Sequence, residues 1–287
     1  MEPRSATRVE PLSGARVEPP RAPAGAGRAR SSCRRLADVD ADPGAAQDRP
    51  ARPRSEPRQR WRLVFRRLPG APEITHRELV DGWLGRLWAS DLPLPQPEGT
   101  RPKSPLSFAA PLPVGMTAER ELADLVLSER LPIADVRAQL ASTLPAGIEV
   151  LELHDVWLGS PPLAASVAAA DYRVECVAHA PSAEIRAAVN ELLAAGTLPR
   201  HRLRGSEPVS YDLRPLVDTI TVERAEATAD GSTTLVLLIR TRFHPERGSG
   251  RPEEVVAALG DLIPGGLDAR QILRAAVLLA EEVAPIG

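Results

Sequence analysis

The chain has 287 residues, of which 43% are hydrophobic, and its formal net charge at pH 7 is −2. This length and apolar content can supply one large core or two smaller ones. The longest apolar run is far shorter than the roughly 20 residues that cross a bilayer, and the start lacks the charged-then-apolar pattern of a signal peptide. We therefore expect a cytoplasmic protein without membrane contacts. Its two cysteines, Cys33 and Cys176, lie too far apart in sequence to favour a structural disulfide.

Residues 1–60 form a leader with a composition of its own. They contain 13 Arg against eight acidic residues and are rich in Pro, Ala and Gly. Neither a helical nor a strand period is visible, and the sequence Arg-Val-Glu-Pro occurs twice, at residues 8–11 and 16–19. Such a segment cannot offset its ordering entropy, so we predict disorder. A passive tail and an arginine-rich arm that touches RNA are both open interpretations.

The first predicted domain covers residues 61–160 and begins with a half-buried strand at 61–66, in which alternate residues are apolar. Thr75 and Glu78 have the spacing of a capping box, and apolar residues then recur at helical intervals. The proline-rich loop 92–105 follows. Two strands, 106–112 and 122–127, are joined through Gly115, and the helix 133–144 is stopped by Gly147 before a strand at 148–153.

The same order of elements returns in residues 170–287. A strand at 172–178 precedes a helix that starts at Ser182, as its cap, and ends at Gly196. Two further strands are predicted at 209–225, bent at Pro215, and at 233–242, with a turn at residues 230–231 between them. Pro252 then opens a helix that Gly260 ends.

The last segment, residues 272–280, is ambiguous. Asp268 and Gln271 have the spacing of a capping box, whereas the symmetry of the repeat requires a closing strand, which we favour. Each half is then a βαββαβ unit. The predicted fold class is α+β, with two tandem ferredoxin-like units whose helices cover one face of an antiparallel sheet.

The residues that carry chemistry are sparse. Two cysteines and five scattered histidines cannot assemble an iron–sulfur cluster or a zinc site, so we expect no metal and no cofactor. The sequence has no Gly-x-Ser-x-Gly elbow, and two cysteines do not define a nucleophile, so we expect no catalytic centre. Residues 99–104 end in Lys-Ser like a phosphate loop, but Pro102 and Pro105 prevent the backbone cradle. Residues 248–251, ahead of the helix at Pro252, could attract an anion, although ordinary helix-start chemistry explains them as well. Aromatic residues make up 3% of the chain, which does not favour a base-stacking platform.

Several segments resemble a bacterial family known as radical-SAM-associated or radical-SAM-linked proteins. The resemblance is carried by KSPLSFAAPLPVG at residues 103–115, followed by ELAD at 121–124. It continues, in the family's order, with ADYRV at 170–174, DLRPL at 212–216 and GSGRPEEV at 248–255. The similar region runs from about residue 61 to residue 279. The family's segments Leu-Ser-His and Gly-Phe-x-Pro-His-Pro correspond here to residues 74–79 and 99–104.

Members of that family occur alone or joined to a radical S-adenosylmethionine enzyme, have no assigned function and are linked to RNA metabolism. The resemblance therefore implies a partner enzyme rather than chemistry in this chain. It also directs attention to a set of candidate binding residues, each of which could instead cap a helix, stiffen a loop or pair on the surface. They are His76, Arg101, Lys103, Ser107, Arg214 and Arg251.

Three functional hypotheses follow. The first is a non-catalytic accessory or substrate-presenting module that works with a separately encoded radical S-adenosylmethionine enzyme. The second is an RNA-binding protein that uses the leader and the loop around Arg101 and Lys103. The third is an enzyme acting on a nucleotide or tRNA base at a cleft between the halves, which requires His76, Arg214 and Arg251 to meet in one pocket.

Overall fold

The computed structural model describes residues 56–96, 103–204 and 207–283. The chain divides into two compact units, residues 1–50 and 51–287, and the described residues all belong to the second. The predicted disordered leader therefore lies outside the described residues up to residue 55, as do Cys33 and Arg101. The first strand starts at Gln59, two residues before the predicted start of the domain.

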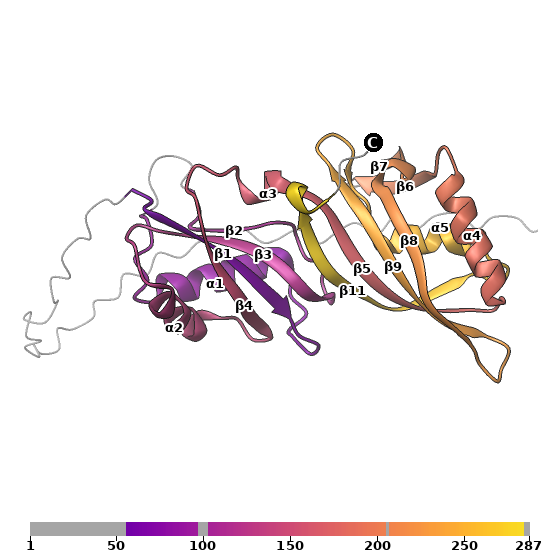
Figure 1. Ribbon diagram of the computed structural model, residues 1–287, viewed down its shortest axis with the longest axis horizontal. Coiled ribbons are helices and arrows are strands. Elements are labelled where there is room, and N and C mark those ends of the chain that lie inside the picture. Colours follow the sequence, from indigo (N-terminus) through magenta and orange to yellow (C-terminus); the bar gives the residue numbers. More distant parts are fainter. Residues whose placement is uncertain (1–55, 97–102, 205–206, 284–287) are drawn as a thin grey trace, which may run out of the picture. The chain divides into compact units, whose positions relative to one another are not determined.

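The first group of elements has the predicted order (Figure 1). It consists of β1 (Gln59–Arg67), α1 (His76–Trp88), β2 (Leu106–Phe108), β3 (Thr117–Leu127), α2 (Ile133–Thr143) and β4 (Ile148–Val156). The capping box is confirmed, since the Thr75 side chain accepts from the Glu78 N–H and the Glu78 side chain accepts from the Thr75 N–H. Strand β2 ends earlier than predicted, because Pro111 and Pro113 have no N–H to donate to a ladder.

The second group contains three elements that the sequence did not predict, α3, β6 and β10. Its members are α3 (Leu163–Ser166), β5 (Val167–Ala178), α4 (Ser182–Ala194), β6 (Pro199–Arg204), β7 (Glu207–Asp212), β8 (Val217–Ala227), β9 (Thr233–His244), β10 (Gly248–Ser249), α5 (Pro252–Gly260) and β11 (Leu267–Leu279). Short 3-10 turns lie at Arg214–Leu216 and Ala280–Glu282. None of the helices in the described ranges is long and apolar enough to cross a membrane.

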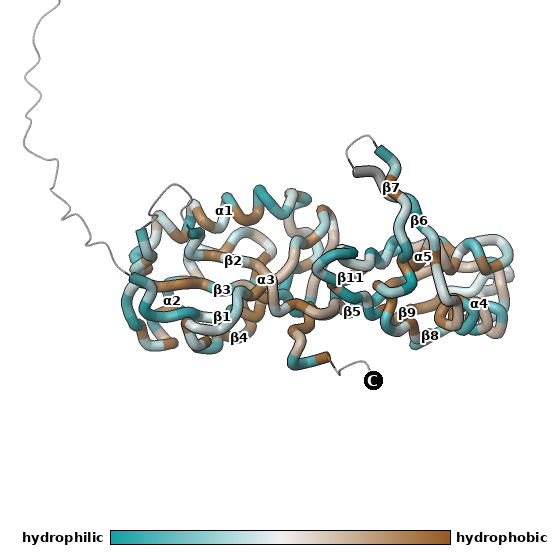
Figure 2. Tube along the Cα trace, turned by 90° about the horizontal axis from the view of Figure 1, so that it is seen from above, coloured by the Kyte–Doolittle hydropathy of each residue, from teal (hydrophilic) through white to brown (hydrophobic). Residues whose placement is uncertain are grey.

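Two predictions for this group were wrong in detail, and strand β6 was missed. The strand predicted at 209–225 is two strands, β7 and β8, because Pro215 forces the 3-10 turn between them. Strand β6, which alternates basic residues rather than apolar ones, pairs with β7 in a separate two-stranded sheet that extends away from the large sheet (Figure 2). Helix α4 starts at Ser182, but its N-cap residue is Pro181 and no side chain caps it.

The closing segment is a strand, as the repeat symmetry predicted. Strand β11 covers residues 267–279 and pairs with β5 along its length. Asp268 and Gln271 are exposed positions of this strand, so they cap no helix.

Nine strands of the described region form one sheet in the order β10-β9-β5-β11-β3-β1-β4, with β2 beside β3 and β8 beside β9. The pairings are antiparallel except for β11 with β3, which is parallel. The structure is thus a mixed α/β fold with a predominantly antiparallel sheet and five α-helices among the described residues. Helices α1 and α2 contact each other beside the first group of strands, and α4 and α5 do so beside the second (Figure 1).

The joint between the groups explains why there is one sheet rather than two. Strand β2 covers only Ala123 to Leu125 of β3 and leaves the beginning of β3 open. Strand β11 pairs there, with Leu273 opposite Thr117 and Arg274 opposite Ala118. Because β3 would otherwise present an unpaired edge at this point, this short parallel pairing satisfies backbone groups of both strands.

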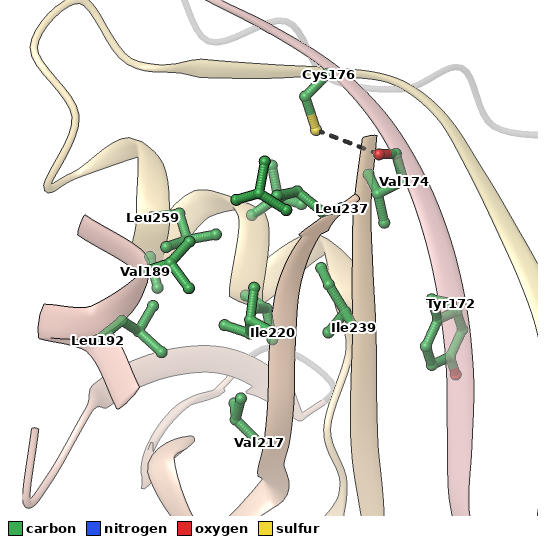
Figure 3. Packing of buried hydrophobic residues seen from close by; sticks show 14 of the residues in the cluster. Tyr172, Val174, Cys176, Val189, Leu192, Val217, Ile220, Leu237, Ile239 and Leu259 are labelled. Atoms are coloured by element: carbon green, nitrogen blue, oxygen red, sulfur yellow. Dashed lines mark hydrogen bonds between the residues drawn. The ribbon is translucent and has the colours of Figure 1, made fainter. Parts of the chain in front are cut away.

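The buried side chains form three clusters, and two of them link the groups. The first cluster lies around Trp83 and Phe65 and the second around Val174 and Leu237 (Figure 3). The second also contains Leu112, Met116 and Ala118 from the first group of elements. A third, smaller cluster joins Leu122 of β3 to Leu163 of α3 and Val277 of β11. Hydrophilic and hydrophobic stretches alternate along α1, consistent with a helix that buries one side (Figure 2).

Candidate functional site

A pocket of about 510 Å³ lies where β11 meets the connection between β2 and β3. This volume is within the range of small-molecule sites. Strands β5, β9 and β11, the β2–β3 connection and the start of α5 all contribute to its wall. The lining residues are Pro111, Leu112, Pro113, Tyr172, Phe243, Ser249, Gly250, Arg251, Pro252, Glu253, Glu254 and Arg274.

A buried ion pair supports the wall of this pocket. The Nε and Nη2 atoms of Arg274 donate to the two carboxylate oxygens of Glu121 over 2.6 and 2.5 Å, and Nη1 donates to the Pro111 carbonyl oxygen over 2.9 Å. Both side chains are only 2% exposed. Burial alone would lower the pKa of Arg274, but the Glu121 carboxylate and then Tyr172 raise it above its ordinary value. The pair therefore ties β11 to β3 and to the β2–β3 connection.

Tyr172 completes this arrangement from β5. Its side chain is buried, and it hydrogen-bonds Arg274. Burial raises the pKa of Tyr172, while the Arg274 charge opposes that shift. Figure 3 shows Tyr172, Val174 and Cys176 at alternate positions of β5, all on the side that faces the core. Because its ring is held in this way, Tyr172 forms a fixed part of the pocket wall.

Gly250 lets two of the resembling segments meet behind the pocket. A Cβ atom at this position would lie 2.6 Å from the Leu216 carbonyl oxygen and 2.9 Å from the Thr241 Cβ. The Gly250 N–H donates to the Arg242 carbonyl oxygen over 3.1 Å, which fixes the start of α5 against β9. Residues 248–255 and 212–216 are therefore in direct backbone contact.

We expect Gly250→Ala to lower the free energy of unfolding by about 1–3 kcal/mol, because the added methyl group must push the Leu216 backbone away. Urea denaturation of the full chain measures the effect. Gly82→Ala is the control, since a Cβ there meets nothing within 4 Å, and it should raise stability because alanine favours the helix. Equal effects of the two substitutions would contradict the packing argument.

The rim of the pocket carries the charged residues that remain accessible. Arg251 is the N-cap residue of α5 and is exposed, and no residue in the described part of the chain pairs with its side chain. Glu253 is exposed in the first turn of the helix, while Glu254 is half-buried and has an interaction partner. Of the five predicted binding residues within the described ranges, Arg251 is the one that lines this pocket.

Arg214 is not part of the pocket lining, and its side chain donates hydrogen bonds to backbone carbonyl groups. Its Nη1 donates to the Val217 carbonyl oxygen over 2.8 Å and its Nη2 to the Leu193 carbonyl oxygen over 2.7 Å. The Asp212 carboxylate accepts from the N–H groups of Leu198 and Arg214. These contacts hold the 3-10 turn that Gly250 approaches.

The remaining predicted residues that the structure describes lie in the first group of elements and are not part of the pocket lining. His76 is the first residue of α1, and its ring meets the edge of Phe108 at a centroid distance of 5.1 Å. Ser107 is exposed on β2 opposite Asp124, and Lys103 is exposed just before that strand. Arg101 lies outside the described residues. The structure therefore does not bring His76 and Arg214 together with Arg251 in the wall of this pocket.

His76 is half-buried, and its Nδ1 has no hydrogen-bond partner in the structure. Burial, and then the charge of Arg274, lower the pKa of its imidazole below 6.5. Since the unfolded chain binds the proton more tightly, the free energy of unfolding should fall as the pH drops below about 6.5. A His76→Gln chain should lose less stability over that range in urea unfolding. An identical pH dependence of the two chains would show that His76 does not contribute.

Cys176 is a core residue rather than a reactive thiol. It is 2% exposed, and burial, followed by the Asp268 charge, raises the pKa of its thiol to about 12. In the described ranges, no group of three or more His, Cys, Asp or Glu side chains is placed to hold a metal ion. We expect the Cys176 thiol of a Cys33→Ala chain to resist an aromatic disulfide reagent in buffer and to react fully in urea. Rapid labelling of the native chain would contradict this burial.

Sequence reasoning missed the buried ion pair that supports the pocket, although signals were present. Arg274 stands alone in the apolar run of residues 272–280, and a lone charge in such a run indicates a buried ion pair. Its partner, Glu121, belongs to one of the resembling segments but was treated only as part of a motif.

The fold and the pocket together define a mixed α/β protein with a ligand-sized cavity at the joint of its sheet. The comparison with protein families is consistent with the resemblance of the sequence to a family without an assigned function. Residues 60–270 match the family described as "Uncharacterized protein conserved in bacteria (DUF2344)", and the chain belongs to this family.

Other comparisons add little. No curated protein matches the chain. Among solved structures, a chain of "Crystal Structure of a Cbf5-Nop10-Gar1 Complex" is 11% identical, with a TM-score of 0.42, and the match covers 74% of this chain and 47% of that chain. The present chain thus spans about half the length of the matched one.

Proposed function

We propose that the protein is an accessory or substrate-presenting module. In this proposal it holds a ligand in the pocket beside Arg274, and the reaction is carried out by a separately encoded radical S-adenosylmethionine enzyme. The partner enzyme comes from the resemblance of residues 103–115, 170–174, 212–216 and 248–255 to proteins that occur with such enzymes.

The observation that supports a binding role is the convergence of these segments. The first contributes Pro111, Leu112 and Pro113 to the pocket, the second contributes Tyr172, and the last contributes residues 249–254. The segment 212–216 touches Gly250 from behind. Stretches that are far apart in sequence therefore build one cavity, which is a common property of ligand sites.

The buried ion pair beside the pocket favours a structural role for Glu121 and Arg274 over a catalytic one. Both carboxylate oxygens of Glu121 accept hydrogen bonds from Arg274, so this acid is committed to holding the wall. A general base must instead have an oxygen free to take a proton from a substrate. Arg274 is similarly occupied by Glu121, Pro111 and Tyr172.

We also propose that each group of elements is a ferredoxin-like unit. This is supported by the strand order β4-β1-β3-β2 in the first group and β11-β5-β9-β8 in the second, where the neighbours are antiparallel in both. Each order is that of a βαββαβ unit whose first and third strands are central. Helix pairs α1–α2 and α4–α5 occupy the two crossover connections.

The partner is tested by affinity capture of the full-length tagged chain in the bacterium that encodes it, followed by mass spectrometry. The proposal expects enrichment of a radical S-adenosylmethionine enzyme, and turnover by that enzyme should increase when the chain is added. Arg251→Glu should reduce the stimulated turnover, whereas Arg247→Glu, an exposed arginine outside the pocket, should not. Repeated capture without such an enzyme, or turnover of a substrate by the purified chain alone, would overturn the proposal.

RNA binding is the second candidate, and β6 favours it. This six-residue strand contains Arg200, His201, Arg202 and Arg204 in the small sheet. Phosphate contacts predict retention on RNA that weakens steeply with salt. The measurement compares the full chain with one that starts at residue 56 and with Arg202→Ala. If the full chain is not retained on RNA at low salt, this function is rejected. If retention is lost on truncation but not in Arg202→Ala, RNA binding belongs to the leader.

A further inference from the structure

The charges that remain available in the pocket beside Arg274 point to the class of its ligand. The lining contains two arginines and two glutamates. Arg274 is neutralised by Glu121, and Glu254 has a partner of its own. Arg251 and Glu253 are left, both exposed at the rim and neither paired with a residue of the described ranges.

A ligand with a single sign of charge is poorly matched to this rim. A phosphate or other anion near Arg251 would also meet Glu253 and Glu254, which already compensate the positive end of α5. A cation near Glu253 would also meet the charge of Arg251, which lies in the same lining. A ligand with adjacent opposite charges can pair with Arg251 and Glu253 at once and leaves the total charge of the site unchanged.

The apolar side chains of the pocket wall indicate what kind of group the uncharged part of the ligand is. Pro111, Leu112 and Pro113 line one part of it, and Phe243 and Pro252 line another. The polar groups at the base, Tyr172 and Arg274, are hydrogen-bonded to each other. An apolar or aromatic body therefore gains more from this wall than a sugar or a phosphate chain would.

We infer that the pocket takes a zwitterionic ligand, with an anionic and a cationic group side by side on an apolar or aromatic body, as in a free aromatic α-amino acid. The anionic group pairs with Arg251 and the cationic group with Glu253, while the body rests against the prolines and Phe243. This inference rests on the proposed function, because it names the class of ligand that the module would present.

The test uses the full-length chain, isothermal titration calorimetry and four probes. L-Tryptophan carries both charges, indole-3-propionate only the anion, tryptamine only the cation, and inorganic phosphate tests for a simple anion site. We expect L-tryptophan to bind about tenfold more tightly than either single-charge analogue, the effect of one charge-assisted hydrogen bond, and phosphate not to bind.

Two variants test which side chain of the protein pairs with each charge of the ligand. Arg251→Gln should weaken L-tryptophan binding about tenfold and should not weaken tryptamine binding, while Glu253→Gln should weaken L-tryptophan binding and should not weaken indole-3-propionate binding. Glu246→Gln and Arg247→Gln are matched controls, since both residues are exposed on the turn before β10 and outside the lining. They should change nothing.

The outcomes separate this inference from the proposed function. Tighter binding of indole-3-propionate or phosphate than of L-tryptophan overturns the zwitterion but leaves a presenting module. Absence of L-tryptophan binding at millimolar concentration, or binding unaffected by Arg251→Gln and Glu253→Gln, also overturns the inference. The proposed function is tested by different measurements. It fails if affinity capture enriches no radical S-adenosylmethionine enzyme and the chain does not increase the turnover of such an enzyme.

Discussion

Arg274→Met should lower the free energy of unfolding by about 3–5 kcal/mol, because it leaves the Glu121 carboxylate buried without a partner. The loss should be large since Glu121 is only 2% exposed and receives both of its side-chain hydrogen bonds from Arg274. Pro111 and Tyr172 lose a donor in the same substitution. Urea denaturation of the full chain measures the change.

The double variant Glu121→Leu with Arg274→Met distinguishes the cost of leaving one charge unpaired from the net contribution of the ion pair to the free energy of unfolding. Replacing a buried pair with apolar residues of similar volume is often neutral or stabilising, so the double variant should recover most of the lost stability. Arg66→Met is the surface control, since the side chains of Arg66 and its partner Glu149 are both about 45% exposed and exposed pairs contribute up to about 1 kcal/mol. A double variant as unstable as Arg274→Met would show that the pair itself holds the joint between β3 and β11.

Local signals predicted the elements because the determinants of those elements are local. The Thr75–Glu78 capping box, Pro252 at the start of α5 and Gly147 at a positive φ each act within a few residues of chain. Strand β6 escaped prediction for the same reason. Its stability depends on pairing with β7, while its own residues show no apolar alternation.

The joint of the sheet and the pocket beside Arg274 could not be predicted in the same way. They depend on Arg274 meeting Glu121, two residues 153 positions apart. Nothing near residue 274 indicates which acid neutralises it, and nothing near residue 117 indicates that the start of β3 is left open by a three-residue β2. The resembling segments contain Pro111, Tyr172 and Arg251, but their sequences do not indicate that these residues share a cavity. Only the register of the sheet places them together.

Trp83→Ala should lower the free energy of unfolding by about 3–5 kcal/mol, the cost of emptying a large buried site. Trp83 is fully buried in α1, and its ring meets the rings of Phe65 at 5.6 Å and Phe108 at 5.7 Å. These contacts connect α1 to β1 and β2, so the loss should reach all three elements. Urea denaturation, followed by far-ultraviolet circular dichroism, gives the size of the effect.

Two further substitutions show whether burial or the indole itself matters. Trp88→Ala, on the same helix but 41% exposed, should cost much less than Trp83→Ala. The Trp83 Nε1 is buried without a hydrogen-bond partner, so Trp83→Phe removes an unsatisfied donor while it keeps an aromatic ring in the cluster. That variant should retain most of the stability that Trp83→Ala loses. If Trp83→Phe were as damaging as Trp83→Ala, the indole N–H would have to make an interaction that stabilises the fold, and the packing explanation for this cluster would fail.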